Sequence, residues 1–488
     1  MARSPALKGS LAPQLQSIFA RLIPANVEAQ RLFSTLADHV LSDATDSAIT
    51  HAAKFMHIEP YSPPETTLDR DMRQESQTST DTDDEISVVS SPNYHGHYIL
   101  SFETNPLTPN IGHTSRTPQD SSIHFGVAGI HATICFDDDG VLTLKTLTER
   151  RGFMTILGND EFTKGRRTIT ERKSCVSFGS LSYYLEYSGL EDEEYNHALR
   201  TYMQDYLMQD APCPDISATP SPMDTLVGDW NIRGTVGSGS FGVVNATKNI
   251  RTGKTGAAKC LVQNSIATHS KILQEIVTLK AIPQNPRLLH YCTEYYERGE
   301  RWYTGILDEL DERYSLRTRP EKVIIIYGPF VRFNLSEELV LKQPFNIRIA
   351  AFYQVLQGLV SLHSGGFIHS DIKPSNIGVV KQSADMINVV ILDYGETIHA
   401  QRCEPHPGKT GTIPFLAPEM EQCPYGKEVD LWATGIVGIQ LFMSGEKVPW
   451  DNVVRAKTAW RKQVEDLQSA PVRVETHDGG SGHALAKH

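Results

Sequence analysis

Residues 366–380 read GFIHSDIKPSNIGVV and hold three polar side chains whose types and spacing suit phosphoryl transfer. Asp371 can accept the proton of an attacking hydroxyl, because a positioned carboxylate is an effective general base. Lys373 can neutralise charge on the phosphoryl group in transit, and the amide of Asn376 can ligate a metal ion. The spacing D-x-x-x-x-N predicts that these residues work together as one catalytic loop.

A second acidic residue follows a short apolar run. Residues 389–392, VVIL, are read as a strand, and Asp393, Tyr394 and Gly395 come directly after it. A turn at the end of a buried strand would hold the Asp393 carboxylate where Mg²⁺ can bridge it to phosphate oxygens. The predicted metal ligands are therefore Asn376 and Asp393.

A glycine-rich segment lies earlier in the chain. Residues 236–244 read VGSGSFGVV, which contains the pattern G-x-G-x-x-G-x-V. Glycines let a turn approach phosphates without Cβ contacts and present N–H groups to the anion. A dinucleotide-binding loop would open a helix, whereas β-like sequence with an RTGK turn follows here, so we predict a β-hairpin. Its predicted nucleotide-binding residues are Val236, Gly237, Gly239, Gly242 and Val244.

A lysine in the next β-like run is a candidate phosphate ligand. Ala257, Ala258 and Lys259 fit an A-x-K strand, although a single strand lysine is by itself more simply read as a solvated charge. The helix-like residues 270–282, SKILQEIVTLKAI, then supply Glu275. A helix carboxylate can pair with Lys259 and hold it towards the phosphates. We therefore predict a Lys259–Glu275 ion pair, with Ala257 beside the nucleotide.

Taken in order, these motifs resemble the catalytic domain of eukaryotic protein kinases over about residues 228–450. Residues 411–419, GTIPFLAPE, and residues 430–435, DLWATG, extend the resemblance. The Lys-Pro-Ser inside the loop and Thr412 are similar to Ser/Thr kinases rather than tyrosine kinases. The resemblance implies ATP and Mg²⁺ as cofactors and protein substrates that accept the γ-phosphate. It also implies an activation segment that includes Thr410, Thr412 and Glu419.

Three departures from that family keep a second interpretation open. Ser370 replaces an Arg that, in many members, pairs with a phosphorylated activation loop, so this chain lacks that charge partner. Gly378 stands where the family places a larger apolar residue beneath the adenine, which predicts weaker nucleotide binding. An Arg expected late in the family's C-lobe would fall beyond His488, so a truncated C-lobe is expected. The alternative is a catalytically weak pseudokinase or scaffold that binds phosphoproteins.

Residues 97–188 contain short β-like runs separated by turn signals, which predicts a β-sandwich or barrel. Five pieces resemble a forkhead-associated (FHA) domain, a sandwich that reads phosphothreonine: NIGH (110–113), SIHF (122–125), GIHA (129–132), RG (151–152) and VSFG (176–179). The resemblance implies partner proteins that contain phosphothreonine.

The phosphate-reading positions of that FHA pattern differ in this chain. His113 and Ala128 stand where the family has Arg and Ser. Arg116 and Arg151 could supply the missing charge, although ordinary solvated loop arginines are the alternative. The candidate phosphopeptide site is therefore His113, Arg116 and Arg151.

Together these readings predict a multidomain chain: an all-β FHA-like sandwich plus a bilobal α+β kinase fold with a β-rich N-lobe and an α-rich C-lobe. This order resembles DNA-damage checkpoint kinases. The expected parts are a helical N-terminal arm (1–60), a disordered Ser/Thr/Asp-rich linker (61–95), the sandwich (96–189), a second linker (190–226), the kinase domain (227–470) and a flexible tail (471–488).

Composition is consistent with a soluble multidomain protein. Hydrophobic residues make up 40% and charged residues 21%, and the net charge of −12 argues against nucleic acid or a membrane as the main partner. The seven cysteines are scattered without a C-x-x-C pair, which indicates free thiols in a reducing compartment and gives no zinc signature. We expect an intracellular protein of the cytoplasm or nucleus, the nucleus being suggested by the resemblance alone.

Overall fold

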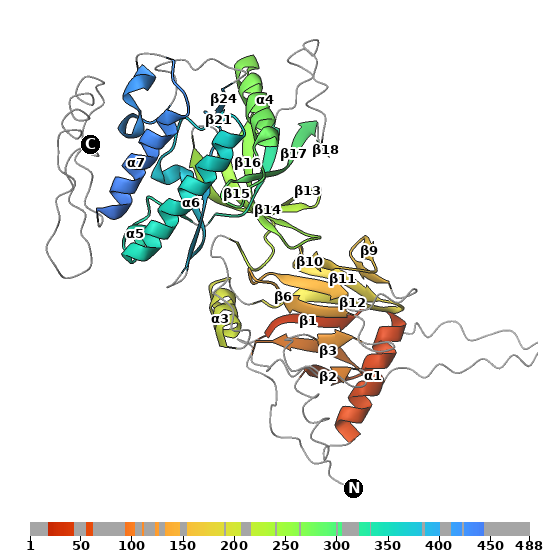
Figure 1. The fold of residues 1–488 in the computed structure, drawn as a ribbon. Coiled ribbons are helices and arrows are strands. Elements are labelled where there is room, and N and C mark those ends of the chain that lie inside the picture. Colours follow the sequence, from red (N-terminus) through yellow and green to blue (C-terminus); the bar gives the residue numbers. More distant parts are fainter. Residues whose placement is uncertain are drawn as a thin grey trace, which may run out of the picture. The chain divides into compact units, whose positions relative to one another are not determined.

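The fold is that of a computed structural model, whose ribbon is shown in Figure 1. It divides into two units, residues 1–224 with 249–253 and residues 225–248 with 254–488, which we describe separately. The residues that the structure describes are 18–42, 55–61, 93–102, 110–111, 123–125, 132–146, 154–189, 192–205, 216–239, 242–262, 265–298, 301–304, 322–331, 333–382, 386–400, 411–421 and 424–443.

The first unit contains two β-sheets that share one core. The strand orders are β2-β3-β1-β12-β11-β8-β9 and β10-β7-β6-β5-β4. The strands are β1 (Ile18–Pro24), β2 (Met56–Pro60), β3 (Tyr94–Ser101), β4 (Asn110–Ile111), β5 (Ile123–Phe125), β6 (Ala132–Phe136), β7 (Leu142–Thr146), β8 (Thr155–Leu157), β9 (Asp160–Phe162), β10 (Arg166–Thr168), β11 (Lys173–Phe178) and β12 (Leu181–Tyr187). Leu22, Leu100 and Leu185 of one sheet pack in the same core as Leu144 of the other. The predicted β-rich region is therefore present, with two facing sheets.

Strand β1 corrects the predicted N-terminal arm. The arm was expected to be helical and separate over residues 1–60, yet β1 lies between β3 and β12, and Leu22 pairs with both Tyr98 and Leu185. Residues 18–24, IFARLIP, are a short apolar run, which periodicity alone cannot assign to a strand or a helix. Among the described residues of this region, α1 (Val27–Ser42) is helical, and it places Phe33 in the shared core.

Helix α3 (Asp192–Asp205) corrects the second predicted linker, residues 190–226. Tyr195 and Leu199 are almost fully buried in the core of the first unit, together with Tyr202 and Met203. Their three- and four-residue steps are a helical signal, which the many charged residues around them obscured. Residues 62–92, 190–191 and 206–215 of the two predicted linkers lie outside the described residues. The ends of both linkers belong to strands, because β3 begins at Tyr94 and β13 (Thr225–Val227) begins before residue 226.

Four polar side chains share one face of the antiparallel pair of β2 and β3. The register places His57 opposite His97 and Glu59 opposite His95. Glu59 lies within 2.8 Å of His57 Nε2 and 3.0 Å of His95 Nε2. Burial, with the charges of His57 and Arg21, lowers the pKa of His97 from 6.5 to about 4.

His97 should make the first unit less stable in mild acid. Between about 4 and 6.5 the unfolded chain binds more protons at this residue than the folded chain does, so the free energy of unfolding falls as the pH falls. Because solvent reaches the half-buried ring, we expect a loss of about 1 kcal/mol between about pH 7 and about pH 5. His97→Gln should remove this loss, and His39→Gln, which changes an exposed histidine, should keep it. Urea-dependent proteolysis, with fragments of the two units separated by mass, measures the loss; an unchanged pH dependence in His97→Gln would contradict the prediction.

The second unit begins β-rich and becomes helix-rich, as predicted. Its sheet orders are β13-β14-β15-β16-β19-β17-β18, β20-β22-β23 and β21-β24. The strands are β13 (Thr225–Val227), β14 (Trp230–Gly239), β15 (Gly242–Asn249), β16 (Thr255–Val262), β17 (His290–Arg298), β18 (Arg301–Tyr303), β19 (Lys322–Gly328), β20 (Phe333–Asn334), β21 (Phe367–Ile368), β22 (Ile377–Gln382), β23 (Ile387–Ile391) and β24 (Ile398–His399). The helices are α4 (Ile266–Ala281), α5 (Glu338–Leu341), α6 (Phe345–Ser364) and α7 (Glu428–Phe442).

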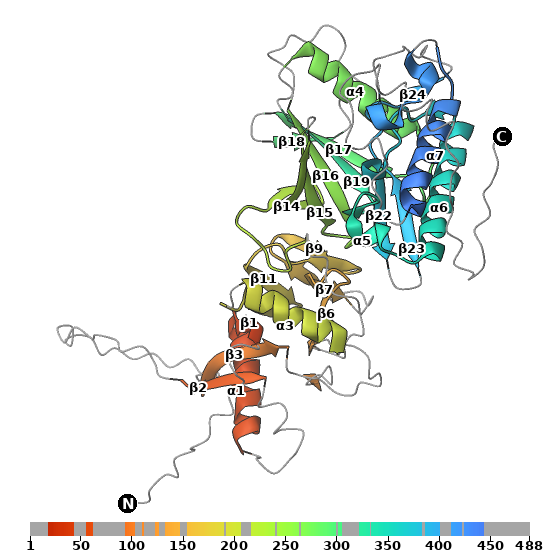
Figure 2. The same cartoon turned by 90° about the vertical axis from the view of Figure 1, so that its left-hand side faces the viewer.

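Helix α6 forms the centre of the helical part of this unit. Its buried residues Ile347, Ala351, Val355, Leu359 and Leu362 follow each other at three- and four-residue steps, as an amphipathic helix requires. The helix packs on β23 and on α7, and both views show α6 and α7 side by side (Figure 2). Within the described ranges, no helix combines the length and apolar content that a membrane crossing needs.

Residues 444–488 lie outside the described part of the chain. The end of the predicted kinase domain, the expected truncation of its C-lobe and the predicted tail over 471–488 therefore stay predictions.

Candidate active site

The predicted Lys259–Glu275 ion pair is present. Lys259 stands on β16, whose neighbours are β15 and β19, and Glu275 lies on α4. The Nζ atom of Lys259 lies 2.6 Å from Oε1 of Glu275, and both side chains are largely buried. An ion pair in such a place fixes the lysine geometrically, because neither charge can turn away without losing its partner.

Tyr327 is a third member of this cluster that the sequence did not reveal. It lies on β19 opposite Ala257, and its hydroxyl donates a hydrogen bond of 3.0 Å to the same Oε1 of Glu275. Burial, followed by the charge of Glu275, raises the pKa of Tyr327 well above its usual value. The tyrosine therefore remains a hydrogen-bond donor that holds the Glu275 carboxylate in place. In the sequence, the sign that Tyr327 could lie near the site was its place at the end of an apolar strand, just before Gly328.

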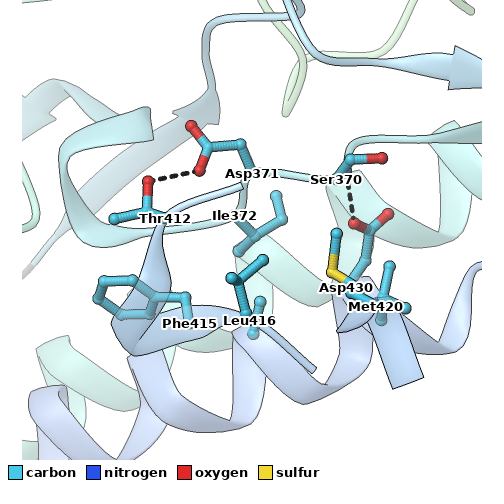
Figure 3. Close-up of a pocket in the computed structure, with 10 residues that line it drawn as sticks. Ser370, Asp371, Ile372, Thr412, Phe415, Leu416, Met420 and Asp430 are labelled. Carbon is cyan, nitrogen blue, oxygen red and sulfur yellow. Dashed lines mark hydrogen bonds between the residues drawn. The ribbon is translucent and has the colours of Figure 1, made fainter. Parts of the chain in front are cut away.

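Three side chains donate hydrogen bonds to the carboxylate of Asp371, and Figure 3 shows one of them, Thr412. Thr412 Oγ1 donates to Oδ1 at 2.7 Å, whereas Lys373 Nζ lies 2.7 Å from Oδ2. Asn376 donates through Nδ2 to Oδ2 at 3.0 Å and to the backbone oxygen of Asp371 at 2.9 Å. Lys373 also donates to Thr412 Oγ1 at 2.9 Å, so the loop and the segment after residue 410 form one network. The predicted catalytic residues and Thr412 thus lie together.

The backbone at His369 and Ser370 is held by Asp430, in the first turn of α7. Its Oδ2 accepts from the amide of His369 at 2.8 Å, and its Oδ1 accepts from the amide of Ser370 at 2.9 Å, as Figure 3 shows for Ser370. Ser370 has the left-handed φ of 69°, a conformation that costs energy for a non-glycine residue. Asp430 is almost completely buried, so its two bonds stabilise this strained point of the loop. The sequence marked Asp430 as a helix start without indicating this function.

A small pocket lies beside Ser370. Ser370, Asp371 and Thr412 line it together with the apolar side chains of Leu416 and Met420, and it has room for about one water molecule. Ser370 itself is buried, and its hydroxyl carries no charge. The described residues around the loop therefore include no cation at the position that holds an Arg in many kinases.

Asp393 follows β23 directly, as predicted. Its φ of 58° is again left-handed, and its Oδ1 accepts a 3.4 Å hydrogen bond from the amide of Gly395. The side chain is exposed, which leaves its carboxylate accessible to a cation. The amide group of Asn376 donates to Asp371, so its Oδ1 is the atom that can take a metal ion. Oxygen atoms of this kind are the ligands that Mg²⁺ prefers, so the residues present fit a magnesium ion.

The glycine-rich segment forms the predicted hairpin, because β14 ends at Gly239 and β15 begins at Gly242. Gly242 has φ of 145°, and a Cβ there would come within 2.4 Å of the backbone oxygen of Cys260. A Cβ on Gly237 would meet no atom within 4 Å. Gly242 is thus required by the sheet itself, whereas Gly237 leaves open space for a ligand to approach. Val236 lies on β14, Val244 on β15 and Ala257 on the neighbouring β16, and all three are at least partly accessible.

Other predicted positions are only partly described. Glu419 lies half-buried in a 3-10 turn (Pro418–Glu421). The candidate phosphopeptide residues His113, Arg116 and Arg151, as well as Thr410, lie outside the described residues.

Gly378 does not leave a hole in the structure. A Cβ at this position of β22 would lie 2.5 Å from Cγ1 of Val331 and 2.9 Å from Cδ1 of Leu392. These two side chains therefore occupy the space of the residue that the sequence lacks.

A larger residue at position 378 should destabilise the second unit. Gly378→Leu overpacks the site against Val331, which we expect to cost about 1–3 kcal/mol of unfolding free energy and to bring no gain in affinity for ADP with Mg²⁺. The double variant Gly378→Leu with Val331→Ala should recover part of the loss, because the two side chains compete for one space. Thermal unfolding and calorimetric ADP titration measure both effects. Wild-type stability in the single variant would show that Val331 does not fill the site.

Comparison with known proteins agrees with this geometry. A family model described as the protein kinase domain matches residues 230–478. Similar proteins include a probable serine/threonine-protein kinase pXi of Dictyostelium discoideum, 28% identical over 212 residues (43% of this chain, 27% of that protein). An Aurora kinase of Yarrowia lipolytica is 26% identical over 265 residues (52% and 64%). Calcium-dependent protein kinase 4 of Plasmodium berghei is 25% identical over 216 residues (43% and 36%).

In each of these comparisons the chain spans less than two thirds of the relative's length. The family match covers just over half of the chain and includes every residue of the candidate active site. The chain therefore belongs to the protein kinase domain family.

Proposed function

We propose that this protein is a Ser/Thr protein kinase that transfers the γ-phosphate of ATP to protein hydroxyls. The observation that carries the proposal is the Asp371 carboxylate, to which Lys373, Thr412 and Asn376 all donate within 3.0 Å. Such a set orients one carboxylate as a proton acceptor and places a cation beside it, as transfer to a hydroxyl requires. The intact Lys259–Glu275 pair supports the same function.

In this proposal each side chain has a separate task. The substrate hydroxyl loses its proton to Asp371 while its oxygen forms a bond to the γ-phosphorus and the bond from that phosphorus to ADP breaks. Lys373 offsets the charge on the group in transit, and Lys259, held by Glu275, positions the phosphates. Asn376 and Asp393 would hold Mg²⁺, which would supply charge neutralisation at the phosphate oxygens. The glycine-rich hairpin covers the phosphates with backbone N–H groups.

Ser370 changes regulation in this proposal and leaves the chemistry intact. The position after His369 carries no positive charge, so phosphate on the activation segment would find no Arg partner there. All groups that act on substrate or nucleotide are present.

A transfer assay with labelled ATP and a generic protein substrate tests the proposal. Labelled phosphate should appear on serine or threonine, and Asp371→Asn should abolish nearly all of it. No transfer by the wild-type chain, with ADP and Mg²⁺ still bound, would favour the pseudokinase or scaffold. Phosphate found on tyrosine would contradict the acceptor class.

We further propose that the first unit is the FHA-like sandwich of a bilobal kinase, and that it directs the protein to phosphothreonine-containing partners, in the nucleus if the checkpoint-kinase resemblance extends to function. Its two facing sheets support this proposal. Fluorescence polarisation with matched phosphorylated and plain threonine peptides tests it, and equal binding of the two peptides would reject it.

A further inference from the structure

The hydroxyl of Tyr394 makes contacts that a phenylalanine at this position could not make. Tyr394 stands between Asp393 and Gly395 and is only 2% exposed. Its hydroxyl accepts from the backbone amide of Leu289 at 3.1 Å and donates to the backbone oxygen of Ile391 at 3.0 Å. Burial raises the pKa of this hydroxyl, so it keeps the proton that it donates.

These contacts join the turn after β23 to a segment distant in sequence. The amide of Leu289 also donates to Ile391 at 3.0 Å, and the amide of Ile391 donates to Arg287 at 2.9 Å. Backbone hydrogen bonds thus join the chain before β17 to the end of β23, and the hydroxyl of Tyr394 adds its own hydrogen bonds at the end of this contact. Its ring lies 5.6 Å from the ring of His369 in the catalytic loop.

The turn that these contacts fix carries strain. Asp393 is one of two non-glycine residues with positive φ among the described residues, and such a conformation persists only when neighbours hold it. Tyr394 is the next residue, so its two hydrogen bonds oppose relaxation of the turn. A rotation that carried the aromatic ring outward would break both bonds and leave buried backbone groups with fewer partners.

We propose that Tyr394 is a positioning residue whose hydroxyl holds the turn so that Asp393 faces the bound metal, without any need for phosphate on the activation segment. The inference rests on the proposed kinase function and specifies its regulation. Ser370 supplies an independent argument, because the chain lacks the cation at this position through which a phosphate could order the loop. The two residues together indicate a kinase whose metal site is formed in its unmodified state.

Hydrogen exchange in the full-length, nucleotide-free chain tests directly whether the Tyr394 hydroxyl holds the turn, a role that we call the lock. In Tyr394→Phe, exchange of peptides from residues 386–400 should be about tenfold faster than in wild type, because two net hydrogen bonds are lost from a local opening equilibrium. Tyr296→Phe is the matched control, since Tyr296 is an equally buried tyrosine of the same unit whose hydroxyl donates to Glu294. Exchange in α6 is the internal reference, and a rise there as large as in 386–400 would indicate general loosening and overturn the proposal.

Metal dependence gives a second readout that general structural damage would not produce. The Mg²⁺ concentration at half-maximal enhancement of ADP binding should rise about tenfold in Tyr394→Phe, whereas ADP binding without metal should stay unchanged. Unchanged Mg²⁺ dependence would overturn the role in positioning Asp393, and unchanged exchange would overturn the lock itself. If the wild-type chain transfers no phosphate while both readouts respond as expected, the proposed function fails and the lock stands.

Discussion

Asp371→Asn is expected to lower kcat by about 10²–10⁴-fold, the range that a lost general base typically costs. The physical reason lies in the donors around the carboxylate. Oδ2 accepts from both Lys373 and Asn376, and Oδ1 accepts from Thr412. An asparagine offers one oxygen and one NH₂ group, so it cannot take the substrate proton. Its NH₂ group must also stand where a carboxylate oxygen accepted hydrogen bonds. The asparagine at position 371 therefore keeps fewer of the hydrogen bonds that the carboxylate accepts.

Initial rates of labelled phosphate transfer at saturating ATP measure this effect. Glu186→Gln is the matched control, because it removes a more exposed carboxylate in the first unit and should leave kcat unchanged. The KM for ATP should change far less than kcat, since Asp371 acts on the acceptor hydroxyl. Equal rates in Asp371→Asn and the wild type would mean that another group accepts the proton or that the activity belongs to a contaminant.

Lys259→Met should lower kcat/KM for ATP by about 10²–10³-fold, as removal of one preorganised charge donor at a transferring group commonly does. Its Nζ lies 2.6 Å from Glu275, and only 15% of the lysine side chain is exposed. The substitution removes the phosphate ligand and also takes the lysine donor from the Glu275 carboxylate, which keeps the hydrogen bond from the Tyr327 hydroxyl. Glu275→Gln should reduce activity less, because the lysine remains but is less firmly held.

The pair can be tested as a unit. The double variant Lys259→Met with Glu275→Gln should be scarcely worse than Lys259→Met alone, since both substitutions remove the same arrangement. Lys322→Met is the matched control: Lys322 lies on β19 of the same sheet, is 54% exposed and pairs with Glu297. Simple multiplication of the two single effects would show that Lys259 and Glu275 act separately.

The sequence was most informative where the chemistry depends on residues close together along the chain. Asp371, Lys373 and Asn376 are one short loop, and their spacing predicted that they would meet. The Lys259–Glu275 pair is less local, but the strand and helix that carry the two residues are consecutive, so their order still indicated contact. The glycine-rich hairpin was also predictable, because β-like sequence with an RTGK turn, and no helical pattern, follows the glycines.

Residues that reach the site through strand register were not predictable. Tyr327 meets Glu275 because β19 pairs with β16, and Val331 fills the space at Gly378 because β20, which begins two residues after it, pairs with β22. Asp430 reaches the amides of His369 and Ser370 from a helix far along the chain. None of these contacts leaves a pattern in spacing or composition. Only tertiary packing creates them.

The place of β1 in its sheet decides which fragments of this protein can be expected to fold. A fragment that began after the Ser/Thr/Asp-rich region, near residue 93, would lack the strand that pairs with β3 on one side and β12 on the other. Two new edges would open in the middle of the sheet, with unpaired N–H and C=O groups facing each other across a gap. Exposed edges of this kind recruit other chains and lead to aggregation. Binding studies of the first unit therefore need a fragment that begins at or before Ile18, with the whole intervening segment retained as a tether.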